Sequence, residues 1–567
     1  MPVHFNDGTD DPLVFDSQPL IGGVNSYGRA STIPPQAASF LKNVELSTSG
    51  ITKSRRGGHY LATNTYGVIH AIISLRISIW DYGLMIFADG NVYLHAETGT
   101  GMLFDAEYDA SAEPHKCSAT EINGAVYFTD GSGDILVIRQ TGTEDILVDD
   151  NGDSIWDDVD SIVSYDVAVE IADPDSPENV RCLTAHRFRL VCANGIDTIH
   201  FSNILPQVSD LGAGNVFPTV SNQIRVGDGR SDKIVSIVPF KDFRLAVLKE
   251  NSIHIVDANP ALDPDEYTIQ LVSDRVGCLA EKSAVRVGDD ILFLSRDGVR
   301  SVGTAFQQDQ IGTSDPLSLP IQDIIEKINW SAAGKSCAAF WRGRYMLTVP
   351  YLNSTVPNVT IVYDTNTKSW AGIWTEWKPT MFEIYEPLGE RRRLVWPDTN
   401  YNNIVSLRDH IDEDDTVETD YQDNLDGTFQ SVPFEIVTRA MSFNDPVSPK
   451  QCDFTELEFF KSKARVNVEL IVDGLDPSSI ESGKLLATGT GDLTLDFTLP
   501  AVLGTPGVVR HNLSLLGNEV GREFQVRVTS CTSDQLTEAG LTTAEQRYIA
   551  MRYVNMGAFL ETMDSQK

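Results

Sequence analysis

The chain has 567 residues, 41% of them hydrophobic, and its 80 acidic residues against 44 basic ones give a formal net charge of −36. This length is enough for roughly two to four domains with ordinary cores. The acidic balance disfavours a nucleic-acid clamp, because neutralising phosphates requires an excess of Lys and Arg. Two interpretations of the charge stay open: a surface that keeps the protein soluble, or one that repels a polyanion.

The cysteines and the apolar runs bear on the cellular compartment. Seven cysteines lie mostly within apolar strand patterns and show no CxxC spacing, so neither a zinc site nor a redox motif is indicated. Cys182 and Cys192 could face each other across a hairpin, but buried free thiols are favoured. The first residues lack the basic and apolar regions of a signal peptide, and no apolar run is long enough to span a membrane. We therefore expect folding in a cytoplasm.

Residues 1–68 are rich in Gly, Pro, Ser and Asn and show little periodicity, which predicts an N-terminal arm. Its ordered-looking motifs are Leu20–Asn25 (LIGGVN), Ile33–Ala37 (IPPQA), Asn43 and Gly50–Gly58 (GITKSRRGG). Lys53, Arg55 and Arg56 form the dense basic cluster of an acidic N-terminal third. This cluster is either a solvated turn beside two glycines or a contact with an acidic neighbouring subunit.

Residues 69–409 repeat a hairpin unit, and the period of about 45 residues is typical of a propeller blade. In the two central copies, Phe243–Leu248 and Ile253–Val256 flank one polar turn, and Ile291–Leu294 and Val299–Val302 flank another. The other five candidate turns are Asp89–Asn91, Asp130–Gly133, Asn194–Gly195, the loop between Val349 and Val359, and Pro397–Asn403. An irregular β-propeller of six or seven blades is predicted, with two irregular β-sandwiches as the alternative.

Two further features of this region bear on its packing. Arg189, Arg244 and Arg344 each stand directly before an apolar run, at the same place in three units. The aromatic run from Trp370 to Trp377 is typical of packing between blades, with a carbohydrate-binding platform as the alternative.

The segment Asp149–Asp157 has the spacing D-x-N-G-D-x-x-x-D of calcium loops found between propeller strands. The expected ligands are the side-chain oxygens of Asp149, Asn151, Asp153 and Asp157 and the carbonyl oxygen of Ile155. Ser154 stands where a glycine normally follows the third ligand, and an acidic surface turn is the alternative interpretation. A calcium ion bound here would be structural rather than catalytic.

Catalytic signatures are missing from the sequence. Gly334-Lys335-Ser336 resembles the end of a P-loop, but Asn329 stands where the first glycine is needed. No HExxH, GxSxG or strand-associated GxGxxG motif occurs, and pairs of carboxylates are expected by chance among so many acids. We therefore expect that the protein is not an enzyme.

The C-terminal third divides into two parts. Residues 410–432 are dominated by Asp and Glu, a composition typical of a solvated linker. Residues 433–567 contain several β-type runs, which predict a separate C-terminal β-sandwich or barrel domain. The predicted class is therefore all-β throughout.

The N-terminal motifs and the order of parts resemble the nozzle, or tail-hub, proteins of short-tailed bacteriophages. Those proteins begin with a GG-I/V segment, a Pro/Gln stretch, an Asn and a G-L/I-x-K-R-x-G/P end. Propeller-like repeats and a C-terminal β domain then follow. This chain has Arg56-Gly57-Gly58 where the family often has Arg-Pro-Gly.

The resemblance implies a structural virion protein of the phage tail, assembled in the host cytoplasm. It implies a homo-oligomeric ring, a hexamer in the resembled family, whose channel conducts genomic DNA during ejection without sequence-specific binding. A tail adaptor protein and tail fibres or spikes are the implied partners. The alternatives are a monomeric propeller that binds glycan or protein and, less favoured by the motifs, a propeller enzyme acting on polysaccharide.

Overall fold

The computed structural model describes most of the chain between residues 14 and 560. The gaps longer than ten residues are 141–164, 206–216, 304–314, 409–420, 488–507 and 532–549. The expected calcium loop Asp149–Asp157 therefore lies outside the described residues. Nearly every described element is a strand, and the one α-helix, α2 (Gln322–Ile325), is a single turn. The all-β class is confirmed.

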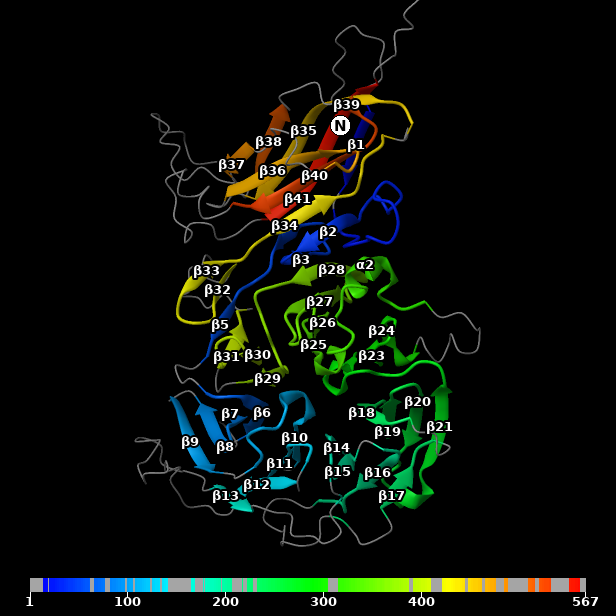
Figure 1. Cartoon of the computed structure of the whole chain (residues 1–567), viewed down its shortest axis with the longest axis vertical. Helices are drawn as coiled ribbons and strands as arrows, with labels where there is room; N and C mark the ends of the chain where they lie inside the picture. The colour runs from blue at the N-terminus through cyan, green and yellow to red at the C-terminus, as the bar shows by residue number, and fades with distance from the viewer. Residues whose placement is uncertain are drawn as a thin grey trace, which may run out of the picture.

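Seven sheets follow one another along the chain and surround a common centre in the lower part of Figure 1. Blade 1 consists of β6 (Ile69–Arg76), β7 (Tyr82–Ala88), β8 (Asn91–Ala96) and β9 (Gly99–Asp105). Blade 2 consists of β10 (Ser118–Ile122), β11 (Ala125–Thr129), β12 (Leu136–Gln140) and β13 (Tyr165–Ala168). Blade 3 consists of β14 (Cys182–His186), β15 (Arg189–Ala193), β16 (Thr198–Phe201) and β17 (Gln223–Arg225).

The remaining blades vary more in their strands. Blade 4 consists of β18 (Ile234–Phe240), β19 (Arg244–Lys249), β20 (Ile253–Asp257) and β21 (Thr268–Ser273). The described strands of blade 5 are β22 (Val285–Val287), β23 (Asp290–Ser295) and β24 (Gly298–Ser301). Blade 6 consists of β25 (Cys337–Trp341), β26 (Arg344–Val349), β27 (Val359–Asp364) and β28 (Ser369–Trp374). Blade 7 contains β29 (Glu383–Tyr385), β30 (Arg393–Asp398) and β31 (Asn403–Leu407).

The blades pack through their first two strands. The first strands of successive blades contact one another from β6 to β25, and β29 of blade 7 contacts β6 of blade 1. The second strands are apolar on both faces because a neighbouring blade covers each side, so β11 is buried along its whole length. This double burial explains why the hairpins are visible in the sequence as uninterrupted apolar runs.

An N-terminal strand completes blade 7. β5 (Gly58–Tyr60) pairs antiparallel with β31, placing Gly58 opposite Leu407 and Tyr60 opposite Val405. The fourth strand of the last blade therefore comes from a segment that precedes the first blade. The predicted propeller of six or seven blades is confirmed, with seven sheets.

The aromatic run predicted as packing between blades is interior. Trp370, Trp374 and Trp377 are all buried, and the Trp377 ring lies 4.7 Å from the ring of Trp396. A carbohydrate platform needs exposed ring faces, so these residues cannot form one.

The second domain, at the top of Figure 1, is built from two sheets that contain strands from both ends of the chain. One sheet continues blade 6 beyond β28 through β2 (Ala38–Lys42), β34 (Glu435–Thr438), β40 (Phe524–Ser530), β36 (Arg465–Val472) and β37 (Lys484–Ala487). The main path of the other is β3 (Val44–Leu46), β4 (Thr52–Ser54), β41 (Ala550–Leu560), β35 (Lys450–Phe460) and β38 (Val508–Ser514). Beside this path, β1 (Val14–Gln18) pairs with β41, and β39 (Val520–Gly521) pairs with β35.

The structure differs from the expected boundaries at two places. The described part of residues 1–68 is not a separate arm, since β2 joins blade 6 to the second domain and β5 belongs to blade 7. The expected linker 410–432 contains β32 (Gln422–Asn424) and β33 (Phe429–Ser431), and β32 pairs with β5. Strands this short, with partners hundreds of residues away, leave no periodic pattern in the sequence.

Gly57 marks the closest approach between these two segments. A Cβ atom at Gly57 would lie 1.7 Å from the backbone oxygen of Gln422, so one of the two backbones would have to move. We expect Gly57→Ala to lower the free energy of unfolding by about 1–3 kcal/mol, the usual range for overpacking. Denaturant unfolding of the full chain measures this change.

Gly334→Ala is the matched control, because its Cβ would meet only the backbone oxygen of Leu279, at 3.7 Å. This variant should be neutral or more stable by about 0.4–1 kcal/mol. Equal stability of the two variants would contradict the close packing of Gly57 on Gln422.

Candidate functional site

The motif residues of the N-terminal segment meet in a buried polar network between the propeller and the second domain. The Arg55 guanidinium is fully buried and donates two hydrogen bonds to the Asp423 carboxylate, 2.8 Å from Oδ1 and 2.6 Å from Oδ2. Its Nη2 also donates to the backbone oxygen of Thr375 at 2.9 Å, and the guanidinium carbon Cζ lies 4.1 Å from the ring centroid of Trp377. This planar, two-pronged pairing is specific to arginine.

Asn43 joins the same network from the other side. Its backbone is left-handed, with φ 54°, a conformation that Asn tolerates better than most residues. The side-chain oxygen accepts from Arg55 Nε at 3.0 Å and from the Thr375 backbone N–H at 2.8 Å. The side-chain nitrogen donates to the Pro433 oxygen at 2.6 Å. One amide therefore links the N-terminal segment, blade 6 and the start of the second domain.

Asp423 is saturated with donors. In addition to Arg55, its Oδ1 accepts from the Gly58 backbone N–H at 2.9 Å and from Trp377 Nε1 at 3.0 Å. A buried charge is tolerated when it is paired and its lone pairs are used, as they are here. The network therefore fixes the positions of β5, β32 and blade 6 relative to one another.

The three residues expected at a subunit contact are engaged within their own chain. Arg55 is inside the network, and Lys53 pairs with buried Glu45 at 3.3 Å. Arg56 lies over the ring of Tyr421, with 5.7 Å between the guanidinium carbon and the ring centroid. Burial alone would raise the pKa of Glu45, but the charges of Arg344, Lys53 and Arg56 outweigh burial and lower it. The Arg55 guanidinium is thus not available to a neighbouring molecule.

Asp423 could not have been singled out from the sequence, because it stands in a run of acids that all look alike. The sequence marks Arg55 as part of a basic cluster. Which residue of the distant acidic run pairs with it follows only from the fold.

Side chains from opposite blades meet across the propeller axis. Lys282, just before β22 of blade 5, donates from Nζ to the Pro114 oxygen at 2.6 Å, just before β10 of blade 2. Lys335 and Glu113 approach to 3.6 Å across the same face. Blades 2 and 5 lie on opposite sides of a seven-bladed ring, so these contacts bridge its centre.

Glu281 is the titratable group of most interest at this place. Burial raises its pKa to about 8, although Lys282, a hydrogen bond from Ser118 and the charge of Arg181 act in the opposite direction. Among the described residues, the charged groups that shift this pKa are Lys282 and Arg181, both cations. Glu281 thus lies next to the Lys282 contact that bridges the centre of the propeller.

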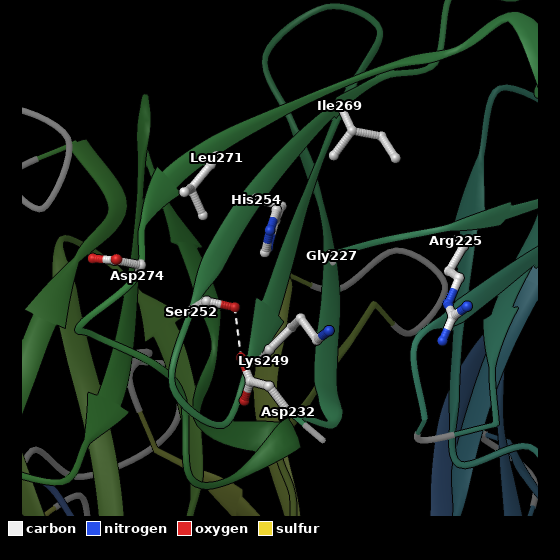
Figure 2. Close-up of a pocket in the computed structure, with 9 residues that line it drawn as sticks. All are labelled: Arg225, Gly227, Asp232, Lys249, Ser252, His254, Ile269, Leu271 and Asp274. Atoms are coloured by element: carbon white, nitrogen blue, oxygen red, sulfur yellow. Dashed lines mark hydrogen bonds between the residues drawn. The ribbon is translucent and has the colours of Figure 1, made fainter. Parts of the chain in front are cut away.

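A pocket of about 280 Å³ opens between blades 3 and 4, and Figure 2 shows its lining. Asp232 accepts a hydrogen bond from Ser252 Oγ at 2.6 Å, and Lys249 Nζ donates to the Val226 oxygen at 2.9 Å. Exposed Ile269 and Leu271 of β21 form an apolar wall. The described lining residues include no Trp, Tyr or Phe, the side chains on which a sugar ring stacks.

The His, Cys, Asp and Glu side chains of the described part bear on metal binding and on disulfide formation. Within the described ranges, no group of three or more His, Cys, Asp or Glu is arranged to hold a metal ion. Six cysteines there are free and buried. Cys182 and Cys192 belong to separate core clusters on the two sides of blade 3, so they do not face each other. None of the described helices has the length and apolar character needed to cross a membrane.

No protein-family model matches the chain, and no curated protein matches its sequence. Solved structures give weak likenesses. The designed protein Ika8 is 12% identical over 61% of this chain and 97% of its own length, with a TM-score of 0.31. The BBS1N chain crystallised with ARL6DN is 11% identical over 62% of this chain and 96% of its own length, with a TM-score of 0.36. PorZ of the Porphyromonas gingivalis type-IX secretion system is 15% identical over 61% of this chain and 37% of its own length, with a TM-score of 0.33. At these TM-scores the likenesses carry no argument about function.

The Arg55–Asp423 pair predicts a strong dependence of stability on one arginine. Arg55→Met leaves Asp423 buried without its cation, and we expect a loss of about 3–5 kcal/mol in the free energy of unfolding. Lys53→Met is the control, because Lys53 is partly exposed and Glu45 keeps Arg344. It should cost about 1 kcal/mol or less. Similar losses in both variants, measured by urea unfolding, would contradict the special role of Arg55.

Glu383 predicts the pH dependence of stability. Burial raises its pKa to about 7, and the hydrogen bond from the Ser74 backbone N–H, at 3.3 Å, only partly offsets this. Because the folded state favours the protonated form, its stabilising effect is complete below pH 4.5, the unfolded pKa, and is lost as pH rises through about 7. The loss by pH 8 should be on the order of 3 kcal/mol.

Glu383→Gln should remove this part of the pH dependence, since the amide keeps an acceptor for Ser74 and cannot ionise. Unfolding curves of the two proteins at pH 5 and pH 8 give the comparison. Parallel pH profiles for wild type and variant would show that Glu383 does not ionise on this range.

Proposed function

We propose that the protein is a structural virion protein, the nozzle or hub of a short phage tail, which forms a ring for the passage of DNA. The observation that carries the proposal is the placement of the motif residues. Asn43, Arg55 and Gly58, on which the resemblance to nozzle proteins rests, contribute to one buried network with Asp423. A recurrent motif is expected where it specifies the junction between two domains.

A second support is the adjoining pair of glycines. A Cβ at Gly22 would lie 2.8 Å from the Gln36 oxygen, so the GG and Pro/Gln motifs pack against each other. Gly23 has φ 67°, and a Cβ there would lie 2.4 Å from the Trp370 oxygen of blade 6. Only glycine fits such a left-handed, crowded backbone. Close packing against Gln36 and Trp370 therefore explains why both positions of this motif are glycine.

The charge and the axis bear on how DNA would pass. A formal charge of −36 suits a surface past which a polyanion must move without binding. The contact of Lys282 with Pro114 crosses the propeller centre, so the proposed channel lies between copies of the chain rather than within one propeller. A ring of copies, a hexamer by the resemblance, would provide that channel. An adaptor ring and fibres or spikes are its proposed partners.

Light scattering of the purified full chain, over a range of concentration and salt, tests the proposal together with electron microscopy of the same samples. We expect one closed ring of defined mass, and no retention of duplex DNA by the assembled ring at physiological salt. A monomer under every condition that also binds tightly on a glycan array would replace the nozzle with a monomeric binding module.

A further inference from the structure

Blades 3 and 4 carry the same three residues at the start of their second strands. Phe188-Arg189-Leu190 leads into β15, and Phe243-Arg244-Leu245 leads into β19. The leucines are buried, whereas Phe188 is 61% exposed and Phe243 is 38% exposed. Packing among the described residues does not explain an exposed phenylalanine at the same place of two neighbouring blades.

The two hairpin tips form one surface. Arg187, beside Phe188, donates from Nη2 to the backbone oxygen of Asp242 at 2.9 Å. Its guanidinium carbon lies 4.8 Å from the ring centroid of Phe243. We call Arg187, Phe188, Arg189, Phe243 and Arg244 the Phe-Arg patch. Phe and Arg are both enriched in protein–protein interfaces relative to the rest of the surface.

The backbone under Phe188 is strained. Arg187 and Phe188 form the two-residue turn between β14 and β15, with φ 49° and 62°. Such turns favour Asn-Gly, because both positions are left-handed. Blade 6 has the same turn at Arg342 and Gly343, with glycine in the second position. A phenylalanine kept where glycine fits best, and exposed there, indicates that its side chain has a use.

The described residues offer the arginines of the patch no carboxylate partner. Arg187, Arg189 and Arg244 form no ion pair within the part of the chain that the structure describes. Asp257 is the cross-strand neighbour of Arg244 in the β19–β20 ladder, but the two side chains form no ion pair. Three arginines without an ion pair among the described residues, on two neighbouring hairpins, are unexpected in a chain with 80 acidic residues.

In blade 6, the arginine that begins the second strand binds carboxylates. Arg344 is the first residue of β26, as Arg189 and Arg244 are of β15 and β19. It contacts the Glu45 carboxylate at 3.2 Å and Asp364 at 3.7 Å. Glu45 belongs to β3, a strand from outside the propeller that docks against blade 6. At blades 3 and 4 the equivalent arginines have no carboxylate partner among the residues that the structure describes.

We propose that the Phe-Arg patch is the docking surface for a second copy of this chain, which brings carboxylates to Arg189 and Arg244 and apolar side chains to Phe188 and Phe243. This inference rests on the proposed ring and names its contact. Copies with a charge of −36 repel one another, so a contact between them needs a cationic, apolar spot on one side. A patch that meets a different, acidic surface of the next copy generates a ring when the rotation between copies closes.

The test uses the full chain and two single variants, Phe188→Gly and Arg244→Glu, with sedimentation velocity over a hundredfold range of concentration. Each variant should raise the concentration at which the ring dissociates by at least tenfold. Phe188→Gly should leave Tm unchanged or raise it, because glycine suits the left-handed turn; lost assembly with a stable fold therefore points to docking. Arg286→Glu, an exposed arginine of blade 5, is the matched charge control and should assemble like wild type.

Three outcomes overturn the inference in different ways. If both variants assemble like wild type, the patch is not the contact, while the ring itself stands. If Arg286→Glu weakens assembly as much as Arg244→Glu, net charge rather than the patch governs association. If wild type stays monomeric at every concentration, the proposed ring fails and this contact fails with it.

Discussion

The fold depends on one buried ion pair, Arg55 with Asp423, which lies where the propeller, the N-terminal segment and the second domain meet. A charged pair in a dry interior is costly unless every donor and acceptor is used. Here the carboxylate accepts from two backbone or ring donors as well as from the guanidinium. Such a network is directional, in contrast to apolar contact, so it selects one arrangement of the three parts among the many that would bury similar area.

The second constraint is that blade 6 is shared. Its sheet runs on through β2 into the second domain, so the strand ladder is continuous across the two. The buried residues of blade 6 and of the second domain belong to one core cluster. The propeller and the second domain therefore share one sheet and one core.

The sequence predicted the propeller hairpins well and the rest poorly, for a physical reason. Each hairpin has its own turn residues and two apolar runs a few residues apart, so local pattern and fold agree. β2 and β5 are short, and their partners β34 and β31 are far away in the chain, so no local pattern marks them. Arg55 was singled out as basic, but its burial follows from Asp423, Asn43 and Trp377, which only the fold assembles. The calcium loop at Asp149–Asp157 stays a prediction.

The strand β5 also has a consequence for how the chain folds. It leaves the ribosome before any blade, yet its partner β31 is the last propeller strand to be made. Blade 7 therefore cannot form until synthesis has passed residue 407, and β5 must remain unpaired during that time. Pairing over such a separation carries a large loop-closure entropy and slows folding. The ring of blades thus closes only after blade 7 has been made, and until then the side of β6 that contacts β29 stays uncovered and open to aggregation.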